Sequence, residues 1–102
     1  MSYKSLEIVA LPRTVTYIDA YAFKNCTSLR TVSVLRNVTE IGGETFTGCN
    51  NLVVQFDGTK EQWEAIKRGV IHSGGSTIRT GNGNYEVHCT DGDFSKQKWW
   101  YN

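Results

Sequence analysis

The side chains that could perform chemistry lie close together near the C-terminal end, in the run from His88 through Cys89 and Asp91 to Asp93. A thiol with an imidazole and a carboxylate is the residue set of a cysteine nucleophile with its general base. Neighbours on a strand point to opposite faces, so His88 cannot easily reach Cys89. An enzyme would need a cleft that gathers His72 or His88 with Cys89 and a carboxylate. We therefore predict no catalytic residues and a chain that is not an enzyme.

The same run contains the side chains that could bind a metal. Asp91, Gly92 and Asp93 resemble the start of a calcium loop, but the further oxygen ligands and the closing glutamate are missing. The histidines and cysteines show no Cys-x-x-Cys pair and no clustered spacing, so they give little support for zinc. We expect a turn at residues 90–93, no metal site and no cofactor.

The cysteines carry a structural prediction. An odd number, three, does not make a disulfide framework. Cys26 and Cys49 occupy equivalent positions of a repeat described below, so their side chains should lie on neighbouring strands or turns and point the same way. Parallel side chains suit the torsion angle of a disulfide poorly. We favour two buried thiols over a bridge, and the state of Cys89 is left open.

Charge and hydropathy exclude several classes of partner. The net charge is +1, with acidic and basic residues in balance, so no basic field is available for nucleic acid. No apolar run has the length of a spanning helix, which argues against membrane insertion. The start, residues 1–4, has no apolar signal core, and we expect that any export signal of a parent protein is absent from this chain.

The central stretch of the chain is a repeat. When the sequence is shifted so that Arg13 falls on Arg36, seven pairs of identical residues superpose, where chance would give about one. The identical pairs are Arg13 and Arg36, Val15 and Val38, Thr16 and Thr39, Ile18 and Ile41, Phe23 and Phe46, Cys26 and Cys49, and Leu29 and Leu52. A unit this short cannot bury its own apolar side, so each copy should stack on the next and share one core. Phe23 should then lie directly above Phe46, and Ile18 above Ile41.

Within each copy the pattern changes period, from alternate positions typical of a strand to spacings of three and four typical of a helical or 3₁₀ turn. The pattern from Leu6 to Leu52, with Leu11-Pro12 and the Ala-Phe-x-x-Cys of residues 22–26, resembles the BspA-type leucine-rich repeats of bacterial surfaces. The resemblance implies a mostly β, α/β fold: a short right-handed leucine-rich-repeat solenoid of about two 23-residue repeats over residues 1–56. It also implies a secreted or cell-surface parent protein.

Residues 57–102 are expected to form a C-terminal capping region. Thr59 and Gln62 fit a capping box, which predicts a helix over 59–68 that docks on the last repeat. The Asn82-Gly83 turn signal predicts a β-hairpin over 77–89. The segment from Gly58 to Trp63 looks like a recurrent ending of a repeat block in this family. The resemblance therefore implies a C-terminal cap as well.

Two surfaces are candidates for binding. In leucine-rich repeats the concave face of the strands is the usual contact surface, which here comprises Ile8, Ala10, Thr31, Ser33, Val53 and Gln55. An alternative explanation for the small residues at these outward positions is crowding on a tightly curved sheet, with no ligand bound there. The adjacent aromatics Trp99, Trp100 and Tyr101 are a second candidate, because aromatic side chains are common interface anchors; alternatively, these rings cover the hairpin or helix, or trail beyond it.

The favoured hypothesis for function is therefore a non-catalytic module for protein–protein interaction or adhesion, with an unidentified protein partner. The alternative is a structural cap or spacer of a repeat array with no ligand of its own. Tyr3, Leu6 and Ile8 would leave an apolar first repeat open, so self-association through the N-terminal end is a further possibility.

Overall fold

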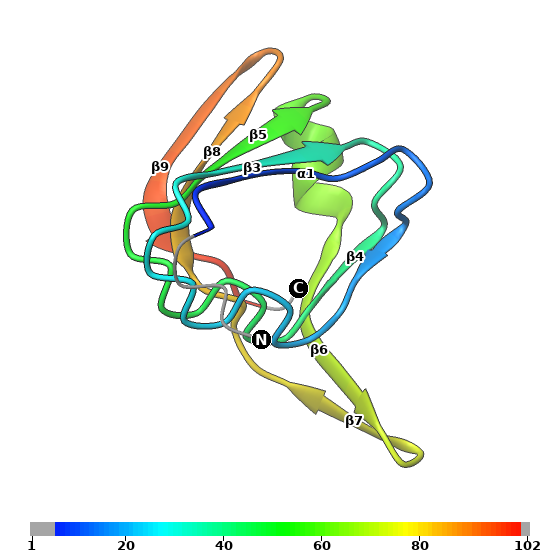
Figure 1. Ribbon diagram of the computed structural model, residues 1–102. Helices are drawn as coiled ribbons and strands as arrows, with labels where there is room; N and C mark the ends of the chain where they lie inside the picture. Colours follow the sequence, from blue (N-terminus) through cyan, green and yellow to red (C-terminus); the bar gives the residue numbers. More distant parts are fainter. Residues whose placement is uncertain (1–5, 101–102) are drawn as a thin grey trace.

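The structure is a computed structural model that describes residues 6–100. Its strands form two sheets that enclose a common core (Figure 1). Sheet A has five strands in the order β1-β3-β5-β8-β9, and sheet B has four in the order β2-β4-β6-β7. The elements are β1 (Ile8–Ala10), β2 (Tyr17–Ile18), β3 (Thr31–Leu35), β4 (Glu40–Gly42), β5 (Val53–Asp57), α1 (Lys60–Ala65), β6 (Lys67–Ser73), β7 (Ser76–Arg79), β8 (Asn84–Cys89) and β9 (Gly92–Lys98).

The sequence repeat sets the register of both sheets. β1 pairs in parallel with β3, with Ile8 opposite Thr31, and β2 pairs in parallel with β4, with Ile18 opposite Ile41. The rings of Phe23 and Phe46 stack with centroids 5.7 Å apart and an interplanar angle of 4°. Equivalent residues therefore lie above one another, as the repeat predicts.

Hydrogen-bonded turns close the side of the molecule between the two sheets. Within these turns the N–H of Lys24 donates to the carbonyl of Tyr21, and that of Cys26 to the carbonyl of Phe23. These are bonds to the residue three positions back, as the spacings of three and four predict. Successive turns are joined as well, because the N–H of Phe23 donates to the carbonyl of Thr45 over 2.9 Å. The turns thus form a third ladder beside the two sheets.

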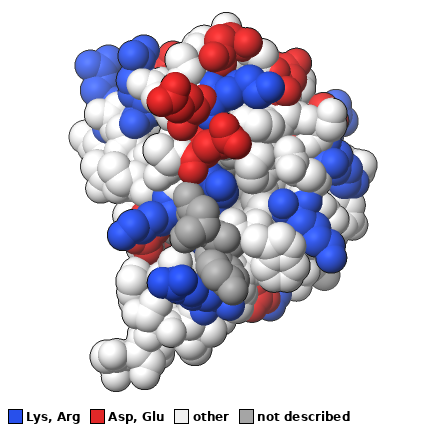
Figure 2. Space-filling model, turned by 180° about the vertical axis from the view of Figure 1, so that it is seen from behind, with Lys and Arg blue, Asp and Glu red and all other residues white. Residues whose placement is uncertain are grey.

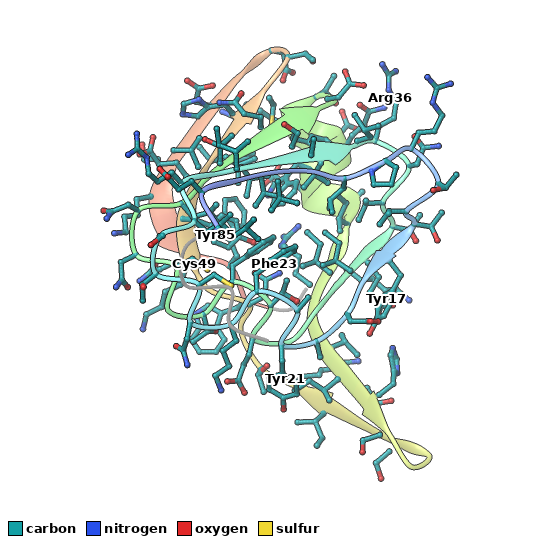
Figure 3. The ribbon with its side chains drawn as sticks, viewed as in Figure 1. Tyr17, Tyr21, Phe23, Arg36, Cys49 and Tyr85 are labelled. Carbon is teal, nitrogen blue, oxygen red and sulfur yellow. The ribbon has the colours of Figure 1, made fainter. Side chains whose placement is uncertain are left out.

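The core lies between the sheets and the turns. Along β3 the residues alternate, with Val32 and Val34 fully buried between half-exposed neighbours, because successive side chains of a strand point to opposite faces. In Figure 3 the side chains of Phe23, Cys49 and Tyr85 point into the ring of the backbone, whereas Tyr17 and Arg36 point away from it. The apolar positions of the repeat therefore supply one continuous core.

Helix α1 covers the β5 end of this core. The predicted capping box is present: Gln62 N donates to Thr59 Oγ1 over 3.1 Å, and Thr59 N donates to Gln62 Oε1 over 2.8 Å. Trp63 is fully buried and meets Phe56 of β5 edge to face at 5.2 Å. The helix thus docks on the last repeat, as predicted.

The predicted extent of the helix, 59–68, is wrong at its C-terminal end. The helix stops at Ala65, and Ile66 already has extended backbone angles. Residues 67–73 form β6 instead, in parallel with β4. A strand in this place gains a ladder of backbone hydrogen bonds and buries Val70 and Ile71, which one further helical turn would not do.

The predicted hairpin over 77–89 is also wrong. β7 pairs with β6 around Gly74 and Gly75, both of which have positive φ as a two-residue hairpin turn requires. β8 pairs in parallel with β5 on one side and antiparallel with β9 on the other. In β8 the side chains of Tyr85 and Val87 face the core of sheet A and are completely buried, because β8 pairs with β5 and not with β7.

Candidate functional site

The six residues predicted for the concave strand face lie together on the outer face of sheet A. Two rows run across the strands in register: Ile8, Thr31 and Val53 form one, and Ala10, Ser33 and Gln55 form the other. Neighbouring strands are about 4.8 Å apart, so each row presents side chains at that spacing. All six are exposed or half-exposed, and Ile8 is 70% exposed.

Strand β8 extends both rows by one residue. Glu86 lies beside Val53, and His88 lies beside Gln55. The sequence prediction missed this extension, because it paired residues 85–89 with the segment that begins at residue 77. The signal available in the sequence is the strand alternation, which puts Glu86 and His88 on one face. We define the outer face of sheet A as these eight residues: Ile8, Ala10, Thr31, Ser33, Val53, Gln55, Glu86 and His88.

The β8 side of the outer face carries its charge. His88 Nε2 lies 3.3 Å from Glu86 Oε1 and 4.0 Å from Asp93 Oδ2 of β9. Toward β1 the rows contain only uncharged residues. A partner would therefore meet uncharged side chains on the β1 side of this face. On the β8 side it would meet the imidazole of His88 with the carboxylates of Glu86 and Asp93.

Two ion pairs away from the outer face of sheet A are exposed. Arg36 lies 3.7 Å from Asp57, and Arg30 lies 3.9 Å from Glu7, with all four side chains more than half exposed. Such pairs contribute little to stability. Figure 2 shows basic and acidic side chains interspersed over the visible face, so no single-sign field appears on its described residues.

The aromatic end divides into one core residue and one surface residue. Trp99 is only 6% exposed, and its indole Nε1 donates to the carbonyl of Tyr85 over 2.9 Å. Its ring meets those of Trp63 and Phe94 edge to face. Trp99 is therefore unavailable to a partner, which corrects its assignment as a contact residue. Trp100 is 54% exposed, and Tyr101 lies outside the described residues.

A buried arginine ties the helix to this aromatic group. The guanidinium carbon of Arg68 lies 5.8 Å from the centre of the Trp63 ring and 5.1 Å from that of Trp99. One guanidinium nitrogen donates to the carbonyls of Trp63 and Ile66 over 2.8 and 3.0 Å. Burial lowers the pKa of Arg68. The arrangement offers its cation to two π faces and to backbone carbonyls of the chain itself, so its role is structural.

The residues that suggested a thiol nucleophile are not arranged for catalysis. Asp91 Oδ1 accepts a hydrogen bond from Lys60 N at the start of α1, and Thr90 N donates to the carbonyl of Gly58. The loop between β8 and β9 thus fastens the helix. Burial, followed by the charge of Asp91, raises the pKa of Cys89, which opposes formation of a thiolate. Within residues 6–100, no three potential ligands come together in a way that could hold a metal ion.

Cys26 and Cys49 are buried free thiols, as favoured from the sequence. Cys49 Sγ donates to the carbonyl of Phe23 at 3.1 Å, across to the preceding repeat. Burial raises the pKa of Cys49 to about 11. Both thiols therefore behave as small core side chains rather than as reactive groups.

Comparison with known proteins places the chain in a family. The profile described as "BspA type Leucine rich repeat region (6 copies)" matches residues 1–66. No curated protein and no solved structure gives a match. In the part of the chain that the structure describes, no helix has the length and hydropathy needed to cross a membrane. With its repeat register and the residues matched, the chain belongs to the BspA-type leucine-rich repeat family.

Proposed function

We propose that this chain is a protein-interaction module that binds a protein partner through the outer face of sheet A. Leucine-rich repeats commonly bind proteins and are generally not enzymes. The finer architecture belongs to the same proposal: a short right-handed solenoid of about two repeats over residues 1–56, followed by a capping region over 57–102.

The observation that carries the proposal is the regular pair of rows across four parallel strands. The residues on the edge strand β1 and its neighbour β3 include the small Ala10, Thr31 and Ser33, so a partner can approach the backbone closely there. Gln55 and His88 at the far side of their row offer donors and acceptors to fix its orientation. Small residues flanked by polar ones suit a recognition surface whose affinity comes from shape and whose specificity comes from a few hydrogen bonds.

The location proposed for the parent protein is the bacterial cell surface or the secreted fraction, with adhesion as its role. BspA-type repeats are typically associated with surfaces. The near balance of charge argues against a purely electrostatic partner such as nucleic acid.

The alternative function is a structural cap or spacer. It is favoured by the covering of the core away from β1, where the ring of Trp99 contacts Trp63 of α1 and Phe94 of β9. At the β1 end, Leu6, Val9 and Leu11 are only partly buried. Self-association through that end belongs to this alternative, and a molar mass that rises with concentration in light scattering would support it.

An unbiased selection distinguishes the two functions. Peptides from a displayed library are enriched on the immobilised wild-type chain, and their affinities are then compared on two triple variants of equal charge. The first variant carries Thr31→Arg, Ser33→Arg and Gln55→Arg on the outer face. The control carries Asn51→Arg, Ser76→Arg and Thr77→Arg at exposed positions outside that face.

An interaction module predicts that most enriched peptides lose at least about tenfold in affinity on the outer-face variant and keep it on the control. Equal losses on both variants, at equal thermal stability, would remove the outer face of sheet A from consideration. An absence of enriched sequences would favour the cap or spacer.

A further inference from the structure

A hollow lies apart from the outer face of sheet A and shares no residue with it. It has a volume of about 430 Å³ and lies where the turn at residues 44–50 meets the segment 80–84 and the end of β9. This volume is within the range of small-molecule sites. Its lining includes an exposed indole, that of Trp100, and polar side chains on several elements. We call it the Trp100 pocket.

The indole of Trp100 is held against the backbone. A Cβ placed on Gly81 would come within 3.1 and 3.2 Å of two atoms of its six-membered ring, so the glycine is what allows the ring to lie there. Lys98 Nζ lies 5.6 Å from the ring centre. With these contacts the ring is still 54% exposed. A positioned aromatic surface inside a hollow is a platform for a ligand.

The polar groups around this platform are mostly uncharged. Thr47, Asn50 and Asn84 line the pocket with hydroxyl and amide groups that both donate and accept hydrogen bonds. Among the described residues of the lining, the one carboxylate, Glu44, is paired with Lys24 at 2.7 Å, and the one ammonium is that of Lys98. Because Lys24 neutralises Glu44 from outside the lining, the charge that remains in the described lining is the single ammonium of Lys98.

These features select among ligand classes. A lipid chain needs a continuous apolar wall, but apart from two tryptophans the described lining is glycine and polar side chains. A phosphate would meet a carboxylate without a cluster of cations. A pyranose ring fits both requirements: its C–H face carries a weak positive charge that suits the negative face of an indole, and its hydroxyls both donate and accept hydrogen bonds.

We propose that the Trp100 pocket binds a neutral pyranose sugar, with one face of the ring on Trp100 and its hydroxyls on Thr47, Asn50 and Asn84. The inference stands apart from the proposed protein-binding face, since the two surfaces share no residue. A chain could bind a protein and a glycan at once.

The test uses the three indole N–H signals of the full chain in ¹H–¹⁵N correlation spectra. Trp63 is buried and does not line the pocket, so its signal should stay in place. The signal of the exposed Trp100 should respond most strongly to a ligand, and that of the buried Trp99, which also lines the pocket, should respond less. The probes are the methyl glycosides of glucose, galactose, mannose and N-acetylglucosamine, and sorbitol serves as an acyclic polyol without a ring face. At least one glycoside should shift the Trp100 signal with saturation in the millimolar range.

Three variants locate the site. Asn84→Ala removes a hydrogen-bonding group and should weaken binding by roughly tenfold. Gly81→Ala puts a methyl group 3.1 Å from the ring of Trp100, so the ring must shift by a few tenths of an ångström, and binding should weaken by a smaller factor. Gly81 is not among the described glycines with positive φ, so alanine is tolerated by the backbone. Ile78→Ala removes a similarly exposed apolar side chain on β7 and should change nothing.

Any of three results would overturn the proposal. The first is a Trp100 signal that responds to none of the four glycosides. The second is an equal response to sorbitol, which would show a contact without ring recognition. The third is a response that survives both Gly81→Ala and Asn84→Ala, which would show a contact elsewhere on the chain.

Discussion

Replacing Phe46 by alanine tests whether the repeats depend on one shared column of side chains. Phe46 is fully buried, with Phe23 stacked on one side at 5.7 Å and Tyr85 edge to face on the other at 5.2 Å. Removal of a buried phenylalanine costs about 3 to 5 kcal/mol of unfolding free energy, part of it from the cavity. We expect about 4 kcal/mol for Phe46→Ala, because a fully buried ring in contact with two other aromatic rings leaves a cavity that cannot collapse easily.

Replacing Phe23 by alanine should destabilise the protein less than replacing Phe46. Phe23 holds the same place one repeat earlier, but it is only partly buried and stacks on one described neighbour. Its replacement should cost about 2 kcal/mol, since water refills part of the space. The double variant should cost less than the sum of the singles by about 1 kcal/mol, the size of an aromatic pair.

The assay is urea unfolding, monitored by tryptophan fluorescence and circular dichroism. For each variant the dependence of the unfolding free energy on urea concentration is compared with that of the wild type. Ile78→Ala is the surface control and should change stability by less than about 0.5 kcal/mol. Equal costs for Phe23→Ala and Phe46→Ala, together with additive behaviour in the double variant, would refute the shared column. A cost of Phe46→Ala below that of the surface control would do the same.

Three further predictions concern single positions. Thr59→Ala removes the acceptor for Gln62 N and should cost about 1 kcal/mol in the same urea assay, whereas Thr59→Ser should cost little. Gly83 has a φ of 128°, and an added Cβ would lie 2.7 Å from the carbonyl oxygen of Phe46. Gly83→Ala should therefore cost more, roughly 3 kcal/mol, because backbone strain and a clash add together. The third prediction is a pH dependence: the pKa of Cys49 is raised by burial from 9.0 to about 11, so the folded state retains a proton that the unfolded state loses. The associated stability is present below about pH 9 and is lost as pH rises toward about 11, by up to about 3 kcal/mol; Cys49→Ala should flatten this decline, and an unchanged slope would contradict the assignment.

The repeated half of the chain was predictable because repetition fixes register. Once Ile18 and Ile41, or Phe23 and Phe46, are recognised as equivalent, stacking follows without knowledge of the tertiary structure. The outer-face residues followed from alternation on the same strands. Glu86 and His88 could not be placed this way, because the pairing of β8 with β5 joins segments that are far apart in the chain and share no sequence pattern.

The non-repeated half contained competing local signals. Gly74-Gly75 and Asn82-Gly83 both favour tight turns, and only the first joins two paired strands. The backbone carbonyl of Asn82 instead accepts a hydrogen bond from the N–H of Phe46. Gly83 lies so close to the same residue that an added Cβ would be 2.7 Å from its carbonyl oxygen. Contacts with the preceding turn, which the sequence does not reveal, decide between the two signals.

The strand pairings explain why the non-repeated segment stacks so well on the repeats. Each repeat visits sheet A, then sheet B, then the turn ladder. After β5 the chain does the same: β6 joins sheet B beside β4, residues 81–82 accept N–H bonds from the turn at residues 44–46, and β8 returns to sheet A beside β5. Helix α1 and the β6–β7 hairpin are insertions in this path and do not change its order.

The path ends at β9, which pairs antiparallel with β8 and forms the edge of sheet A. β9 carries Lys96 and Lys98, and charged side chains on an edge strand oppose the addition of another strand. Backbone pairing therefore continues the stack beyond the point where the residue pattern stops, since a ladder requires matched hydrogen bonds and not matched side chains.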